Sequence, residues 1–119
     1  MKIIKSEDRE WLEKEGYSKK IFLDEKDLNY PGILVQEIRI KSGDEAKEHY
    51  HKRQTEIFYF LTENGYWIIN KEKYFFKKGD ILTIEPFDKH AVLNDSTEDY
   101  IYLAFKFNYI PEDLYQAND

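Results

Sequence analysis

Short stretches rich in β-branched and aromatic residues, separated by turn-forming residues, recur along the whole chain. In the stretch 56–63, Glu56, Phe58 and Phe60 share one face of an extended strand, and the residues between them share the other. Comparable stretches predict further strands at 2–5, 19–24, 33–40, 47–51, 80–85, 90–94 and 100–109. The segments 65–70 and 73–80 predict a hairpin around the turn NKEK.

Helical signals are few. The stretch 6–16 predicts a short helix, with Ser6 as its cap and Gly16 just past its end, and Pro111 can begin one helical turn before the last residues fray. Because strands do not alternate with long helices, a parallel α/β sheet is disfavoured. About eight to ten short strands instead predict an all-β sandwich or barrel with a short N-terminal helix or turn.

The composition fits one globular domain. The 119 residues are 41% hydrophobic, and ten Tyr, eight Phe and two Trp supply the bulk of a core. The net charge is −6 with no basic stripe, so nucleic acid is not an expected partner. No stretch has the length and apolarity of a signal peptide or a membrane span, so a cytoplasmic protein without a membrane partner is expected.

The histidines are the strongest chemical signal. His49 and His51 are one residue apart, and on a strand both imidazoles point to the same face. Four residues then lead to Glu56, a length that suits a turn into an antiparallel neighbour, whereas His90 must come from a more distant strand. The chain has no cysteine, so metal ligands must be His, Asp or Glu. Ordinary packing or surface histidines are the alternative.

The spacing around these histidines resembles the two motifs of the cupin superfamily. The first, over residues 43–65, reads Gly43, five residues, His49-Tyr50-His51, four residues, Glu56, eight residues, Gly65. The second, over 79–94, reads Gly79, five residues, Glu85-Pro86-Phe87, two residues, His90, three residues, Asn94.

The sequence departs from the family pattern at two places. Eight residues instead of about six separate Glu56 from Gly65, which predicts a longer hairpin turn. Glu85 and Phe87 stand where the family usually has Pro and Gly. Because Phe tolerates a positive φ poorly, the turn before His90 is expected to differ in backbone shape.

The resemblance implies one cupin domain over residues 1–119, a double-stranded β-helix or jelly-roll barrel. It implies that His49, His51, Glu56 and His90 hold one divalent transition metal per chain in the mouth of the barrel. Such ligands suit Fe, Mn, Ni, Co, Cu or Zn and leave the identity of the metal open. The glycines are then turn residues and Asn94 is structural.

Around the metal, Phe58 and Phe60 are expected to line the cavity, because they share the face of Glu56. Parity alone does not decide whether Tyr102 or Leu103 points inward on the late strand. Arg39, Arg53 and Glu85 can serve a substrate, but a solvated surface position is favoured for each.

The resemblance implies several functions. The preferred hypothesis is a small metalloenzyme of dioxygenase, isomerase or lyase type that acts on a small polar metabolite such as a sugar or keto acid. No catalytic residue stands out beyond Glu56, Glu85 and the tyrosines. The alternatives are a non-catalytic ligand-binding or sensor domain and a metal-free barrel. A homodimer formed through exposed sheet edges and the N-terminal strand is also expected.

Overall fold

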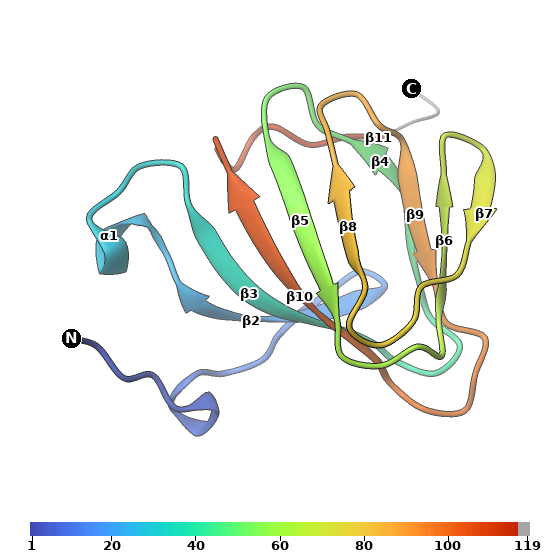
Figure 1. Cartoon of the computed structure of the whole chain (residues 1–119), viewed down its shortest axis with the longest axis horizontal. Helices are drawn as coiled ribbons and strands as arrows, with labels where there is room; N and C mark the ends of the chain where they lie inside the picture. Colours follow the sequence, from blue (N-terminus) through green and yellow to red (C-terminus); the bar gives the residue numbers. More distant parts are fainter. Residues whose placement is uncertain (117–119) are drawn as a thin grey trace.

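The computed structural model describes residues 1–116 and consists mainly of two antiparallel sheets that enclose a barrel (Figure 1). The six-stranded sheet has the order β1 (Leu12–Lys14), β2 (Tyr17–Leu23), β3 (Leu34–Ile40), β10 (Tyr100–Phe107), β5 (Thr55–Phe60) and β8 (Ile81–Ile84). The five-stranded sheet has the order β11 (Tyr115–Gln116), β4 (Glu45–Tyr50), β9 (His90–Leu93), β6 (Tyr66–Ile69) and β7 (Glu72–Tyr74). The predicted all-β jelly roll is confirmed.

The inner faces of the two sheets share one aromatic core. Phe60, Trp67 and Tyr100 are fully buried at its centre, and Tyr100 accepts a hydrogen bond from the Trp67 indole at 3.0 Å. This bond satisfies the buried indole N–H, which would otherwise cost free energy. On β10, Tyr102 is buried, whereas Leu103 on the other face is half-buried, so the parity left open by the sequence is decided.

The N-terminal segment differs from the prediction. Residues 2–5 form no strand, and the predicted helix over 6–16 is replaced by a 3₁₀ turn, η1 (Ser6–Asp8), followed by β1. The segment 6–16 has too few apolar residues for a buried helical stripe. Trp11 instead packs against Arg39, whose guanidinium carbon lies 4.2 Å from the ring centre.

Two further elements were missed. Helix α1 (Glu25–Leu28) is capped by Asp24, whose side chain accepts hydrogen bonds from the backbone N–H groups of Lys26 and Asp27. At the other end, Pro111 opens a turn that is not helical and leads into β11. The predicted fraying of the last residues concerns 117–119, which lie outside the described part.

Different structural constraints require glycine at the three motif positions Gly43, Gly65 and Gly79. Gly43 and Gly79 adopt φ values of +83° and +91°, as turn residues do. Gly65 has no positive φ; a Cβ there would lie 2.2 Å from the ring of buried Tyr100. The turn of the following hairpin is formed by Asn70 and Lys71, both with positive φ, as the right-handed twist of a two-residue hairpin requires.

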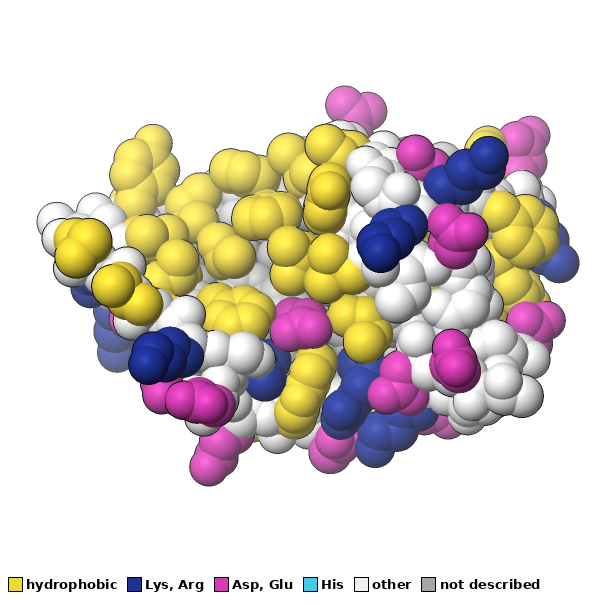
Figure 2. All heavy atoms as spheres, turned by 60° about the horizontal axis from the view of Figure 1, so that its bottom comes forward, with side chains coloured by type: hydrophobic (Ala, Val, Ile, Leu, Met, Phe, Trp, Pro, Cys, Tyr) yellow, Lys and Arg dark blue, Asp and Glu magenta, His cyan; other side chains and the backbone are white. Residues whose placement is uncertain are grey.

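The outer face of the six-stranded sheet is largely apolar over β10, β5 and β8. Its outward positions carry Val35 on β3, Leu103 and Phe105 on β10, and Tyr59 and Ile81 on β5 and β8. Figure 2 shows hydrophobic side chains covering much of one side of the molecule. Within residues 1–116, no helix is long and apolar enough to cross a membrane.

Candidate metal centre

Strand pairing brings the three histidines together. His49 on β4 is the direct partner of His90 on β9, and His51 follows two residues after His49. One ring nitrogen from each of the three lies within 4.8 Å of the others. Glu56 comes from β5 in the opposite sheet, and its Oε1 lies 3.0 Å from His51 Nε2 and 3.9 Å from His90 Nε2.

Backbone carbonyl groups fix the tautomer of all three imidazoles. Nδ1 of His49 contacts the carbonyl oxygen of Lys47 at 2.7 Å, and Nδ1 of His90 contacts that of Asp88 at 2.9 Å. His51 Nδ1 makes the same contact with the Asp113 carbonyl. Because a carbonyl oxygen only accepts, each Nδ1 carries the hydrogen and each neutral ring has its lone pair on Nε2. Histidines that bind metals are commonly held in this way.

The contact between His51 and Glu56 calls for a cation. His51 Nε2 is buried and has no hydrogen-bond partner, although the carboxylate oxygen of Glu56 lies only 3.0 Å away. With no hydrogen between them, two electron-pair donors this close repel each other, and either a proton on Nε2 or a metal ion can relieve this. A metal ion bound by both would remove that repulsion, so the residues fit the metal that the sequence predicts.

The protonation states also suit metal binding. Burial lowers the pKa of His49, and burial together with the neighbouring His49 lowers the pKa of His90 to about 3. Burial raises the pKa of Glu56, but a hydrogen bond from His51, when its Nε2 carries a proton, and the charge of Lys106 outweigh burial and bring the value to about 2. At neutral pH these residues are therefore two neutral imidazoles and a carboxylate, the forms that bind metals.

The turn before His90 keeps a left-handed backbone despite its unusual residue. Phe87 adopts φ +72°, so the expected change of backbone shape at this position is not found. Its N–H donates to the carbonyl oxygen of His51 at 2.7 Å, and its ring stacks on Tyr50. These contacts offset a conformation that costs a bulky residue about 1–2 kcal/mol.

Asp113 anchors the C-terminal segment against the metal centre, a role that the sequence did not reveal. Its carboxylate accepts hydrogen bonds from the backbone N–H groups of Lys52, Arg53 and Gln54 at 2.8–2.9 Å. Its carbonyl oxygen accepts from His51. One residue therefore fixes both the loop after β4 and the orientation of the His51 ring.

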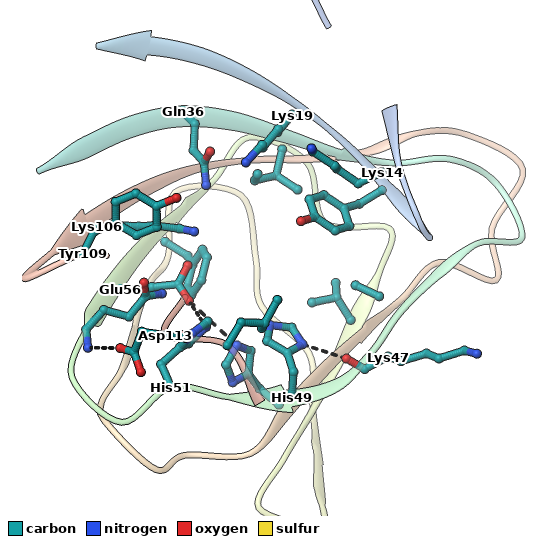
Figure 3. A pocket seen from close by; sticks show the side chains of 18 of the residues that line it. Lys14, Lys19, Gln36, Lys47, His49, His51, Glu56, Lys106, Tyr109 and Asp113 are labelled. Carbon is teal, nitrogen blue, oxygen red and sulfur yellow. Dashed lines mark hydrogen bonds and ion pairs between the residues drawn. The ribbon is translucent and has the colours of Figure 1, made fainter. Parts of the chain in front are cut away.

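The four residues lie at a cavity of about 570 Å³, within the usual range for small-molecule sites (Figure 3). Phe58 lines it, as predicted. The expectation for Phe60 is not met, because Phe60 is fully buried in the core against Trp67 and Phe76. The cavity-lining residues do not include Arg39, Arg53 or Glu85, whereas Asn94 bonds the Ile40 and Glu98 carbonyl oxygens, a structural role.

Polar residues that the sequence analysis missed line the rest of the cavity. They are Lys14, Glu15, Lys19, Gln36, Lys47, Gln54 and Lys106, together with Tyr109, Asp113 and Gln116 from the C-terminal segment. Gln36 and Lys106 occupy inward positions of strands whose other inward residues are mostly apolar. The sequence alone did not reveal them, because which face of these strands points inward becomes known only from the strand register.

Three solved structures have the same fold. The polyketide cyclase RemF from Streptomyces resistomycificus has a TM-score of 0.83 at 14% identity, covering 98% of this chain and 85% of its own. KdgF from Halomonas sp. has a TM-score of 0.79 at 15% identity, covering 94% and 97%. A predicted oxalate decarboxylase from Thermotoga maritima has a TM-score of 0.75 at 19% identity, covering 89% and 98%. At these identities the likeness shows the fold alone.

Among curated proteins, none matches this sequence. The family model of the cupin domain matches residues 36–106, more than half of the chain, and this range contains all three histidines and Glu56. The chain therefore belongs to the cupin family.

Proposed function

We propose that this cupin is a metal-dependent enzyme that acts on a small polar metabolite such as a sugar or keto acid. One observation carries the proposal: one ring nitrogen from each of three histidines lies within 4.8 Å of the others, beside the carboxylate of Glu56, in a cavity of about 570 Å³. Four protein ligands leave one or two positions of a five- or six-coordinate ion for a substrate or water, as catalytic metals require.

The walls of the cavity favour catalysis over simple storage of a metal. A bound metal would act as a Lewis acid on a carbonyl or hydroxyl group of the substrate. Lys106 lies directly across the strand pair from Glu56, and Tyr17 and Tyr102 add hydroxyl groups to the wall. These groups can orient a polar substrate and stabilise charge that develops on it. Phe58 and Trp67 keep part of the wall dry, which strengthens such electrostatic contacts.

The names of the structural neighbours support an enzyme but no particular reaction. RemF is named a polyketide cyclase, and the Thermotoga maritima protein a predicted oxalate decarboxylase. We therefore leave the reaction open among the dioxygenase, isomerase and lyase types. A non-catalytic binding or sensor domain remains the second candidate, because no residue combination in the cavity identifies a proton-transfer pair. A cytoplasmic location stays a prediction.

The test is turnover by protein of known metal content. Untagged protein is loaded in turn with Mn, Fe(II), Co, Ni, Cu and Zn and incubated with aldoses, ketoses, 2-oxo acids and diketones. Oxygen consumption and proton NMR follow the reactions. We expect one metal to support turnover that His49→Ala abolishes. A protein that binds both metal and ligand but turns over none of them is a binding domain.

We also propose that two copies of the chain pair through the apolar outer face of the six-stranded sheet. Tyr59 and Ile81 are paired across β5 and β8 there and are 39% and 65% exposed, and Glu37 and Arg39 lie among the apolar residues of the same face. In a two-fold pairing, opposite charges on one face can meet their counterparts on the second copy. Broad apolar surfaces of this kind mark interfaces.

Replacing Ile81 with lysine is expected to convert this dimer into a monomer. Ile81 is mostly exposed in the single chain, so the substitution leaves folding nearly unchanged but places a charge in the interface. Sedimentation velocity should give twice the 14.5 kDa chain mass for the wild type and the chain mass for Ile81→Lys. The control is Phe75→Lys, because Phe75 is an exposed aromatic residue that lies beyond β7. This variant should remain dimeric. The pairing is refuted if the wild-type protein is monomeric at a concentration on the order of 100 μM.

A further inference from the structure

The cavity has an excess of cations although the chain as a whole is acidic. Four lysines line it, Lys14, Lys19, Lys47 and Lys106, in a protein of net charge −6. Three carboxylates also line it: Glu56 lies beside the histidines, Asp113 accepts from three backbone N–H groups, and Glu15 pairs with Lys47 at 3.7 Å. Among the described residues, Lys14, Lys19 and Lys106 form no ion pair.

Strand register places Lys19 and Lys106 on one diagonal line of polar residues across the inner face of the six-stranded sheet. Lys19 on β2 pairs with Ile38, and Gln36 is two residues along β3. Gln36 in turn pairs with Ala104, and Lys106 is two residues along β10, directly opposite Glu56. Diagonal neighbours of this kind are about 7–8 Å apart. The diagonal Lys19–Gln36–Lys106 thus crosses the sheet that faces the histidines.

Gln36 strengthens the case for a ligand. Its side chain is 2% exposed, and its Oε1 has no hydrogen-bond partner. A buried carbonyl oxygen without a partner costs free energy and is rare in folded proteins. Because Gln36 lines the cavity between the two lysines, a bound molecule with a hydroxyl or similar donor can supply the missing bond.

The lysines also repel one another in the free protein. Burial, and then the charges of Lys106 and Lys14, lower the pKa of Lys19 to about 8. Figure 3 shows Lys14, Lys19, Gln36 and Lys106 around one part of the cavity, with His49 and His51 opposite and Lys47 directed away. A negative charge between these groups would remove the repulsion and gain charge-assisted hydrogen bonds.

We propose that the cavity binds a small organic anion, with its anionic group held by Lys19 and Lys106 and a polar group held by Gln36. The rest of the molecule would extend toward the histidines. This inference rests on the proposed function and narrows its substrate from small polar metabolites to organic acids or phosphate esters. Neutral sugars lack the charge that would satisfy the two ammonium groups.

The test compares anions with a neutral analogue in variants of the full chain. Binding of succinate, its diamide succinamide and inorganic phosphate is measured by calorimetry, with and without bound Zn²⁺. We expect the wild type to bind succinate or phosphate at least tenfold more tightly than the diamide, and binding to weaken with added salt. Lys19→Gln and Lys106→Gln should each weaken anion binding by about tenfold or more. Lys47→Gln removes the same charge at the rim and should leave the affinity within about twofold.

Each outcome separates this inference from the proposed function. If the affinity for succinate depends on the two lysines, the anionic group is a carboxylate. If the affinity for phosphate does, it is a phosphate. If Zn²⁺ binds but neither anion is preferred over the diamide, or Lys47→Gln weakens binding as much as the other variants, the anion site is refuted and the metal site stands. If Zn²⁺ does not bind while the anion affinity still depends on Lys19 and Lys106, the metalloenzyme fails and the anion site stands. Circular dichroism confirms that each variant is folded.

Discussion

Replacing His90 with glutamine should reduce metal binding by more than the 10–100-fold that loss of an outer hydrogen-bond partner costs. His90 is 1% exposed and directs Nε2 toward the ring nitrogens of His49 and His51. Glutamine is close to histidine in size, so packing against Trp67 is largely kept while the imidazole lone pair is lost. The remaining ligands cannot replace it, because within the described residues no further histidine lies near the site.

Tryptophan fluorescence provides the measurement. The Trp67 ring stacks on His90 with 6.1 Å between ring centres, whereas Trp11 packs outside the cavity. In a Trp11→Phe background, Cu²⁺ or Co²⁺ should therefore quench Trp67, and His90→Gln should suppress the quenching. Tyr50→Phe is the matched control, because Tyr50 lies between the two ligands in sequence but stacks on Tyr115. Equal quenching in the wild type and His90→Gln would mean that the metal binds elsewhere.

Replacing Asp113 with alanine is expected to destabilise the protein by about 3 kcal/mol or more. The substitution removes the acceptor of three backbone N–H groups, of which that of Gln54 is buried and the other two are partly buried, and a hydrogen bond to a charged group contributes about 1.5–3 kcal/mol. For a chain of this size the melting temperature should fall by about 10 °C. Glu112→Ala, at the exposed neighbouring residue, should change the melting temperature by little.

The effect of Asp113 should depend on pH in a defined direction. Burial raises the pKa of its carboxyl group, but the three backbone donors outweigh burial and lower the pKa below its ordinary value. A pKa lowered by folding stabilises the protein above the unfolded pKa of about 3.9 and stops doing so as the pH falls through the folded value. Denaturant melts should therefore show a difference between wild type and Asp113→Ala that is constant at neutral pH and shrinks below about pH 4. A difference that grows on acidification would contradict this role.

The sequence predicted the strands that carry the metal centre because their signals are local. The pair His49 and His51 needs only the alternation of a strand, and the short turn before Glu56 predicts an antiparallel return. The strands 33–40, 90–94 and 100–109 were predicted to within a few residues, since their inward positions are largely apolar. The family resemblance implied that His90 joins the other ligands, whereas its pairing with His49 was not predicted and comes from the structure.

The errors arise where distant segments decide the structure. Residues 6–16 carry helical caps, but β1 pairs with β2 and Trp11 packs on Arg39, so tertiary contacts override local preference. The segment around Pro111 looks helical in isolation, yet Asp113 binds the loop after β4 and draws β11 into the sheet. The diagonal Lys19–Gln36–Lys106 was not predicted, because only the strand register shows that these residues lie close together on one face of the sheet.

The most direct test of the metal centre is a crystal structure of untagged protein grown with Zn²⁺, with data collected at the zinc absorption edge. The account predicts one strong anomalous peak per chain, about 2.0–2.1 Å from Nε2 of His49, His51 and His90 and bonded to the Glu56 carboxylate. No peak among these side chains at full zinc saturation, or a peak with Glu56 turned away, would contradict it.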